Sequence, residues 1–159
     1  MTIAPVRKQI VVDASVEHAF LVFTERFDTW WPLETHHIGA ITPDTGVIEG
    51  HVGGRCFERS PDGTETVWGH VLAWEPPTRL VLSWEVSHDW VCDPANMSEV
   101  EVRFIAESPT RTRVELEHGK LEVAFGEHAQ EMYDTFNSEG GWNGLLTRFA
   151  AAATEQPGA

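Results

Sequence analysis

The chain has 159 residues, of which 25 are acidic and 11 are basic, and its formal net charge at neutral pH is −14. This length and an apolar fraction of 42% are typical of a single soluble globular domain. Nucleic acids and anionic membranes attract basic surfaces, so the charge argues against both as partners. No apolar stretch approaches the roughly 18 residues of a membrane-spanning helix, so no membrane insertion is expected.

The N-terminus lacks the apolar segment of a signal peptide, and two cysteines are too few for a disulfide framework. We therefore expect a cytoplasmic protein with free thiols. Along the chain, residues 6–14 predict a strand, and Ser15 is a preferred residue for capping the helix that should follow it. Residues 27–32 predict one more short helix, which Pro32 ends.

From about Thr45 onward, short apolar stretches are separated by turn residues, as in an antiparallel sheet. The expected strands cover residues 46–49, 55–59, 65–74, 79–86, 98–106 and 111–119. After them, apolar residues at three- and four-residue spacing predict a short helix near 127–137 and a longer one near 139–154. The order is that of an α+β domain, in which the C-terminal helix covers the apolar face of a curved sheet.

Five segments, taken together and in order, resemble a known family. They are Phe27-Asp28-Thr29-Trp30-Trp31-Pro32, Gly53-Gly54-Arg55-Cys56-Phe57-Glu58-Arg59, residues 68–77, residues 79–84, and Gly140-Gly141-Trp142 with Leu146. They resemble the START-like (SRPBCC) superfamily, and within it the branch related to the activator of heat-shock protein 90 ATPase. The resemblance runs from about Val6 to Ala153. It implies one START-like domain over residues 1–159 with the helix-grip fold, in which six to seven strands wrap around a long C-terminal helix.

The superfamily includes lipid carriers, hormone receptors, polyketide cyclases and aromatases, so the resemblance implies a cavity without fixing an activity. The preferred hypothesis is a cytoplasmic binding protein for a small hydrophobic or aromatic molecule, which favours the absence of a catalytic acid–base pair without deciding whether a reaction is catalysed. A second hypothesis is an enzyme that resembles polyketide cyclases, aromatases or dehydratases and uses the same cavity. A third is a chaperone ATPase cofactor that acts through its surface. No cofactor is expected, and exposed edge strands leave a homodimer open.

Seven tryptophans in 159 residues form either a bulky core or the walls of a pocket. Trp30 and Trp142 are favoured for the cavity by their position in the family pattern. The full set of expected cavity residues combines family position with strand alternation: Trp30, Trp31, His37, Trp68, His70, Trp84, His118, Phe136, Trp142 and Leu146.

Two histidines on strands are candidates for proton transfer. Alternation places His118 on the inward face, and His70 alternates with Trp68 and Leu72 and is predicted to share their face. An inward histidine beside an inward carboxylate, for which Glu58 is the candidate, suits the chemistry of a cyclase or dehydratase. The alternative is a hydrogen-bonded histidine within the core.

Two further motifs carry weaker indications. His36 and His37 are adjacent and point apart, and no third ligand stands at zinc spacing, so we expect no metal and a polar role at the cavity mouth. Arg55 follows two glycines and either anchors a ligand carboxylate or carbonyl, or forms a surface ion pair. The ion pair is the favoured reading.

Overall fold

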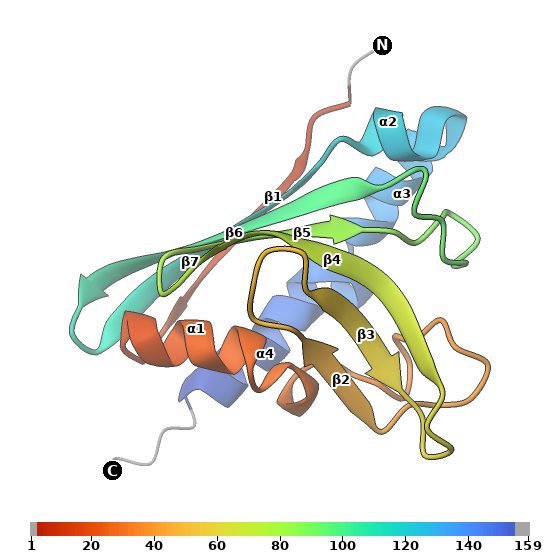
Figure 1. Ribbon diagram of the computed structural model, residues 1–159. Coiled ribbons are helices and arrows are strands. Elements are labelled where there is room, and N and C mark those ends of the chain that lie inside the picture. Colours follow the sequence, from red (N-terminus) through yellow and green to blue (C-terminus); the bar gives the residue numbers. More distant parts are fainter. Residues whose placement is uncertain (1–2, 155–159) are drawn as a thin grey trace.

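A seven-stranded antiparallel sheet curls around a C-terminal helix in the computed structural model, which describes residues 3–154 (Figure 1). The spatial order of the strands is β1-β7-β6-β5-β4-β3-β2. Their bounds are β1 (Val6–Val12), β2 (Thr45–Ile48), β3 (Arg55–Arg59), β4 (Glu65–Glu75), β5 (Arg79–Trp84), β6 (Ser98–Ser108) and β7 (Arg111–Gly119). The predicted α+β helix-grip fold is confirmed, and each expected strand is present to within about two residues.

The N-terminal helical segments follow the expected pattern in part. Helix α1 (Val16–Thr24) begins after Ser15, whose side chain accepts the backbone N–H of His18 at 3.1 Å, as the cap prediction requires. The short helix expected over residues 27–32 is only the single 3₁₀ turn η1 (Phe27–Thr29). Trp30 and Trp31 therefore lie just beyond the turn rather than within a helix.

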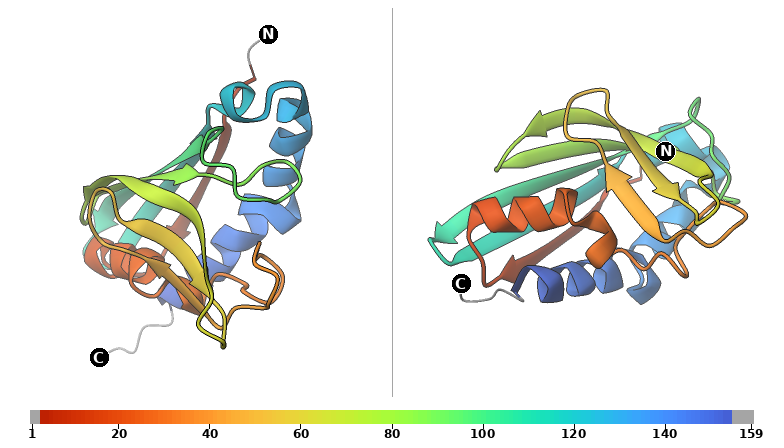
Figure 2. Two further views of the ribbon diagram at one scale, coloured as in Figure 1. Left: turned by 45° about the vertical axis from the view of Figure 1, so that its right-hand side comes forward. Right: turned by 60° about the horizontal axis from the view of Figure 1, so that its bottom comes forward.

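The C-terminal third contains five helical segments instead of the two expected (Figure 2). They are α2 (Leu121–Phe125), η2 (Gly126–His128), α3 (Ala129–Phe136), η3 (Glu139–Asn143) and α4 (Gly144–Thr154). Helix α2 was not predicted because its five residues are too few to display helical periodicity. The predicted break at Gly140-Gly141 is present as the wide turn η3, which joins α3 to α4.

The kink in η3 depends on a glycine. A Cβ atom at Gly141 would lie 2.4 Å from the carbonyl oxygen of Phe136 and 2.5 Å from that of Thr135, so only a residue without a side chain fits. The kink turns the chain so that Trp142 becomes buried. The sequence pattern thus places one indole between the sheet and the last helix.

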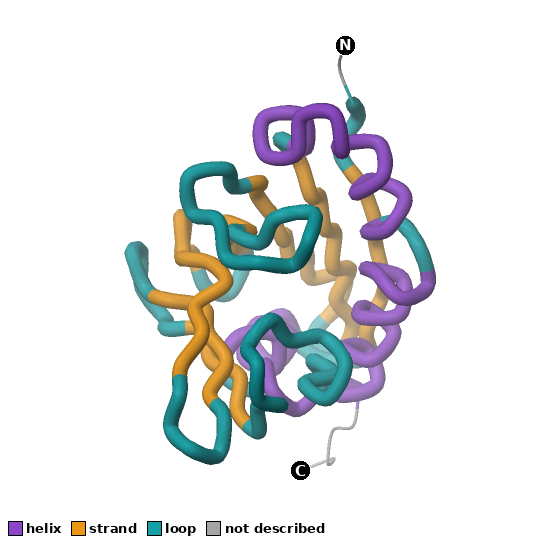
Figure 3. The backbone as a smooth tube through the Cα atoms, turned by 90° about the vertical axis from the view of Figure 1, so that its right-hand side faces the viewer, coloured by secondary structure: helices purple, strands orange, loops and turns teal. Residues whose placement is uncertain are grey.

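The concave face of the sheet is apolar, and α1 and α4 cover one half of it. Phe23 of α1 packs against Phe104 of β6 and Phe149 of α4, with ring centroids 5.7 and 5.2 Å apart. In Figure 3, loops lie between the strands and the chain of helices on the other side of the view. The candidate site is formed by residues of these loops, of the sheet, and of α3, η3 and α4.

Candidate functional site: a tryptophan-walled cavity

A cavity of about 500 Å³ lies between the sheet and the segment α3–η3–α4. This volume falls in the range of small-molecule sites, roughly 300–1,000 Å³. Its apolar walls are Trp31, Ile38, Trp68, Trp84, Val86, Trp90, Phe136, Trp142 and Leu145. Its other lining residues are Thr35, His36, His37, Glu58, Thr135, Ser138, Gly140 and Gly141.

The aromatic walls come from four distant parts of the chain. Trp31 follows η1 and stacks in parallel with Trp68 of β4, with an interplanar angle of 4° and ring centroids 6.1 Å apart. Trp84 of β5 lies edge-on to Phe136 of α3 at 5.4 Å and to Trp142 at 6.1 Å. Because these rings pack against one another, most of the apolar wall is flat aromatic surface, and Ile38, Val86 and Leu145 form its aliphatic part.

His118 is fully buried and forms part of the support behind these walls. The indole N–H of Trp142 donates to its Nδ1 at 3.0 Å, and since an indole only donates, the ring proton of His118 sits on Nε2. Nε2 then donates to Ser98 Oγ at 2.7 Å. Burial lowers the pKa of His118 to about 3, so the ring is neutral near neutral pH. His118 does not line the cavity; it positions Trp142, which does.

Of the residues that the structure describes, Glu58 is the one acidic residue in the cavity wall. Its carboxylate is buried and accepts the backbone N–H groups of Ile38, at 3.1 Å, and Gly39, at 2.6 Å. This bonding fastens the segment after Trp31 to β3. No hydrogen bond joins Glu58 to His118 in the described part of the chain, so the acid–base pair expected of these two residues is not formed.

The adjacent histidines both line the cavity but have different bonding. His36 Nε2 donates to the carbonyl of Gly140 at 2.8 Å, which leaves its Nδ1 to accept from Thr35 Oγ1 at 2.8 Å. His37 Nδ1 donates to the carbonyl of Gly39 at 3.0 Å. The Nε2 atom of neutral His37 is therefore an acceptor, with no partner among residues 3–154. Within the same residues, no three His, Cys, Asp or Glu side chains converge as metal ligands would.

The comparison with known families follows from this fold and cavity. The sequence profile described as Activator of Hsp90 ATPase homolog 1-like protein, AHSA1, matches residues 13–154. The chain belongs to the AHSA1 family. A search of curated proteins returned no match. Among residues 3–154, no helix of this AHSA1 protein is both long and apolar enough to cross a membrane.

Three solved structures are similar to this AHSA1 protein in fold. An anthrahydroquino-gamma-pyrone synthase, Txn09, complexed with SUM, is 41% identical over 94% of this chain and 97% of its own, with a TM-score of 0.64. The self-sacrificing resistance protein CalC from Micromonospora echinospora is 29% identical over 98% and 97%, with a TM-score of 0.72. The Aha1 dimer from Colwellia psychrerythraea, 16% identical over 98% and 100% with a TM-score of 0.64, shares the fold.

Among the ten expected cavity residues, those placed in the wall are Trp31, His37, Trp68, Trp84, Phe136 and Trp142. Trp30, beside Trp31, is instead in the core, where its indole N–H donates to the carbonyl of Val22 at 3.2 Å. Leu146 is buried in α4 but only its neighbour Leu145 reaches the cavity.

His70 faces the outer side of the sheet, contrary to the prediction from alternation. Cys56 pairs with Gly69 but Phe57 pairs with Val67, so Trp68 is an extra residue in a β-bulge. The bulge reverses the alternation, and His70 Nδ1 donates to Glu85 Oε2 at 2.8 Å on the outer face. Its side chain is 42% exposed there, away from the cavity.

The expected set lacks four apolar wall residues, namely Ile38, Val86, Leu145 and the largest of them, Trp90. Trp90 lies in the loop between β5 and β6, where no strand or helix pattern assigns a direction to the side chain. The available signal was a large aromatic residue in a loop of mixed polar and apolar residues. No sequence pattern predicted the three lining hydroxyl residues, which are Thr35, Thr135 and Ser138.

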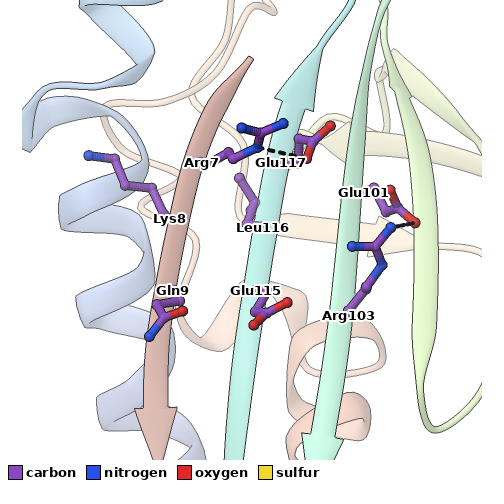
Figure 4. Close-up of a pocket in the computed structure, with 8 residues that line it drawn as sticks. All are labelled: Arg7, Lys8, Gln9, Glu101, Arg103, Glu115, Leu116 and Glu117. Carbon is purple, nitrogen blue, oxygen red and sulfur yellow. Dashed lines mark hydrogen bonds and ion pairs between the residues drawn. The ribbon is translucent and has the colours of Figure 1, made fainter. Parts of the chain in front are cut away.

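The outer face of the sheet carries charged residues of both signs. Figure 4 shows a shallow hollow there, with Arg7 paired to Glu117 at 3.1 Å and Arg103 paired to Glu101 at 3.1 Å. Arg55 belongs to this face as well and pairs with Glu49 at 2.9 Å, which confirms the surface ion pair. The hydrogen bonds from Arg55 lower the pKa of Glu49 to about 2.

Proposed function

We propose that the cavity binds a flat, polycyclic aromatic molecule that carries oxygen substituents along one side. The observation that carries this proposal is the wall of mutually packed indoles from Trp31, Trp68, Trp84 and Trp142. Flat rings stack favourably on such surfaces. Hydroxyl and imidazole groups of the other lining residues suit the oxygen substituents of the same molecule.

The charge of the lining narrows the ligand class. Glu58 is acidic, and among residues 3–154 neither a lysine nor an arginine lines the cavity. A ligand carboxylate would find no cationic partner there, so a neutral molecule is favoured over a fatty acid or another free acid. The 41% identity to a protein named for an anthrahydroquinone and γ-pyrone product supports the polycyclic aromatic class.

The other expectations have less support. A chaperone cofactor acting through its surface predicts a filled core, whereas about 500 Å³ is open beside the tryptophans. A cytoplasmic location is supported by Cys56 and Cys92, which are both free thiols.

Titration with danthron, a neutral dihydroxyanthraquinone, tests the binding proposal. The wild-type protein is expected to bind one equivalent, measured by calorimetry and by quenching of tryptophan fluorescence. Trp84→Phe should weaken binding about fivefold through lost stacking area. This variant removes no hydrogen bond, because the indole N–H of Trp84 has no hydrogen-bond partner among the described residues.

Trp74→Phe is the matched control. Trp74 packs edge-on against Phe20 at 5.1 Å, outside the cavity, so its variant should bind danthron within about twofold of wild type. Absence of saturable binding by the wild-type protein, or equal weakening in both variants, would contradict the proposal.

A second candidate function is closure of an oxygen ring on the bound molecule, favoured by the free Nε2 of His37 in the wall. In such a step a phenol oxygen adds to a ketone of a 1,3-diketone, and the hemiketal loses water to give a γ-pyrone. His37 Nε2 would take the phenol proton and deliver it to the ketone oxygen, which gives the hemiketal. It would then take a proton from the carbon between the two carbonyls and deliver it to the hydroxyl group, which departs as water. The reaction needs no oxidant, because reactant and product differ only by water.

The cyclisation of o-hydroxybenzoylacetone to 2-methylchromone, followed by absorbance, tests this candidate. His37→Gln is expected to slow the catalysed reaction by about a hundredfold, while danthron affinity changes little. His51→Gln, at an exposed histidine outside the cavity, is the control. The candidate fails if the wild-type protein gives no rate above buffer, or if both variants retain the wild-type rate.

A further inference from the structure

Trp90 differs from the other six tryptophans in its exposure. Its side chain is 46% exposed, whereas the indoles of the cavity wall, such as Trp84 and Trp142, are 8% and 4% exposed. Trp90 nevertheless lines the same cavity. A large aromatic side chain that is both at a cavity and open to solvent leaves apolar surface uncovered, and a bound aromatic ligand would cover it.

The backbone holds Trp90 in this position against its ordinary preference. Its φ of +64° lies in the left-handed region, which is rare for a bulky residue. A tight turn maintains this geometry: Ser87 N–H donates to the carbonyl of Val91 at 2.8 Å, and Trp90 N–H donates to the carbonyl of Ser87 at 2.9 Å. Such strain typically gathers at functional sites, where the rest of the structure sustains it.

The turn from Ser87 to Val91 is joined to the rest of the molecule at two places. At its base, Val86 and Cys92 form an antiparallel bridge. At its tip, the ring of His88 stacks on that of His128 in η2, with centroids 3.7 Å apart and an interplanar angle of 10°. The turn therefore spans from β5 to the helical side of the cavity and carries Trp90 between these two supports.

We propose that Trp90 is the aromatic cap of the cavity. This inference rests on the proposed function. A flat ligand lies with one face on the fixed indoles, and the Trp90 indole covers a face or edge of the ligand that is left open to solvent. The cap makes Trp90 a specificity-determining residue. It favours ligands with an extended aromatic surface at the mouth over ligands that only fill the interior.

Danthron binding to Trp90→Ala, Trp90→Phe and Val91→Ala tests the cap. Alanine and phenylalanine both keep a Cβ at the same backbone geometry, so the first two variants differ only in the ring. Trp90→Ala is expected to bind about tenfold more weakly, mainly through faster dissociation, and Trp90→Phe within about threefold of wild type. Val91 is 58% exposed in the same turn and does not line this cavity, so Val91→Ala should match wild type.

Fluorine NMR of protein labelled with 5-fluorotryptophan supplies a direct readout. The resonance absent from Trp90→Phe identifies Trp90, and its shift between H₂O and D₂O should shrink when danthron binds, because the indole becomes covered. Unchanged affinity in Trp90→Ala together with an unchanged solvent shift would overturn the cap while leaving the binding proposal intact. If danthron does not bind the wild-type protein, both proposals fall together.

Discussion

At the scale of single residues, His118 shows how a titratable group can serve a purely structural purpose. It is enclosed by Phe136, whose ring lies 4.2 Å away, and hydrogen-bonded through both nitrogens to Ser98 and Trp142. The bond from Trp142 requires the neutral ring, because Nδ1 must accept it. The same enclosure that suits His118 to orienting an indole makes it unsuited to carrying a proton near neutral pH.

This placement predicts a pH dependence of stability. The pKa of His118 falls from the ordinary 6.5 to about 3 on folding, so between these values the unfolded chain binds a proton that the folded chain does not. Stability is therefore lost as the pH falls below 6.5. Between pH 7 and pH 5 this single group should cost on the order of 2 kcal/mol of unfolding free energy.

Urea denaturation of the wild type and of His118→Gln, each at pH 7 and at pH 5, isolates the effect of this residue. The variant is less stable at neutral pH, but its stability should fall less on acidification, since glutamine does not titrate. Parallel changes in the two proteins would show that His118 is not the responsible group.

At the scale of secondary-structure elements, the irregular pairing of β4 shapes the site. The bulge at Trp68 sends that indole inward and His70 outward, and the register of β4 with β5 shifts again after Val71. Between these irregularities, Gly69 passes very close to β5. A Cβ at Gly69 would lie 2.1 Å from the carbonyl oxygen of Ser83, which is backbone and cannot rotate away.

Gly69→Ala is therefore expected to lower the unfolding free energy by about 3 kcal/mol, because two paired strands must separate to admit one methyl group. Gly140→Ala is the matched control, since a Cβ there meets nothing within 4 Å, and its effect should stay within about 0.5 kcal/mol. Thermal or urea unfolding measures both. Equal stability of the two variants would mean that the strands yield at Gly69 without cost.

At the scale of the whole molecule, the two faces of the sheet differ in polarity. The outer face carries ion pairs between acidic and basic side chains, such as that of Arg113 with Glu107 at 2.7 Å. Such a charged surface favours solubility. The concave face is apolar; α1 and α4 cover one half, and the cavity occupies the end beside α3 and η3. Strands β1 and β2 are the edges of the sheet, and a homodimer formed through them stays a prediction.

Sequence alone determined the architecture, because the signals for it are local. Alternation along β6 and β7, the cap at Ser15 and the break at Gly141 each depend on a few neighbouring residues, and each has the expected outcome. The abundance of tryptophan left two possibilities, a bulky core or the walls of a pocket.

Only the tertiary structure decided which side chains reach the cavity. Trp30 and Trp31 are adjacent, yet the end of η1 directs one into the core and the other into the wall. The side of the sheet on which His70 lies depends on a bulge, which arises from the pairing of β4 with β3. The position of Trp90 depends on a turn whose His88 stacks on His128 of η2. These outcomes depend on contacts between residues far apart in the chain, which local patterns do not encode.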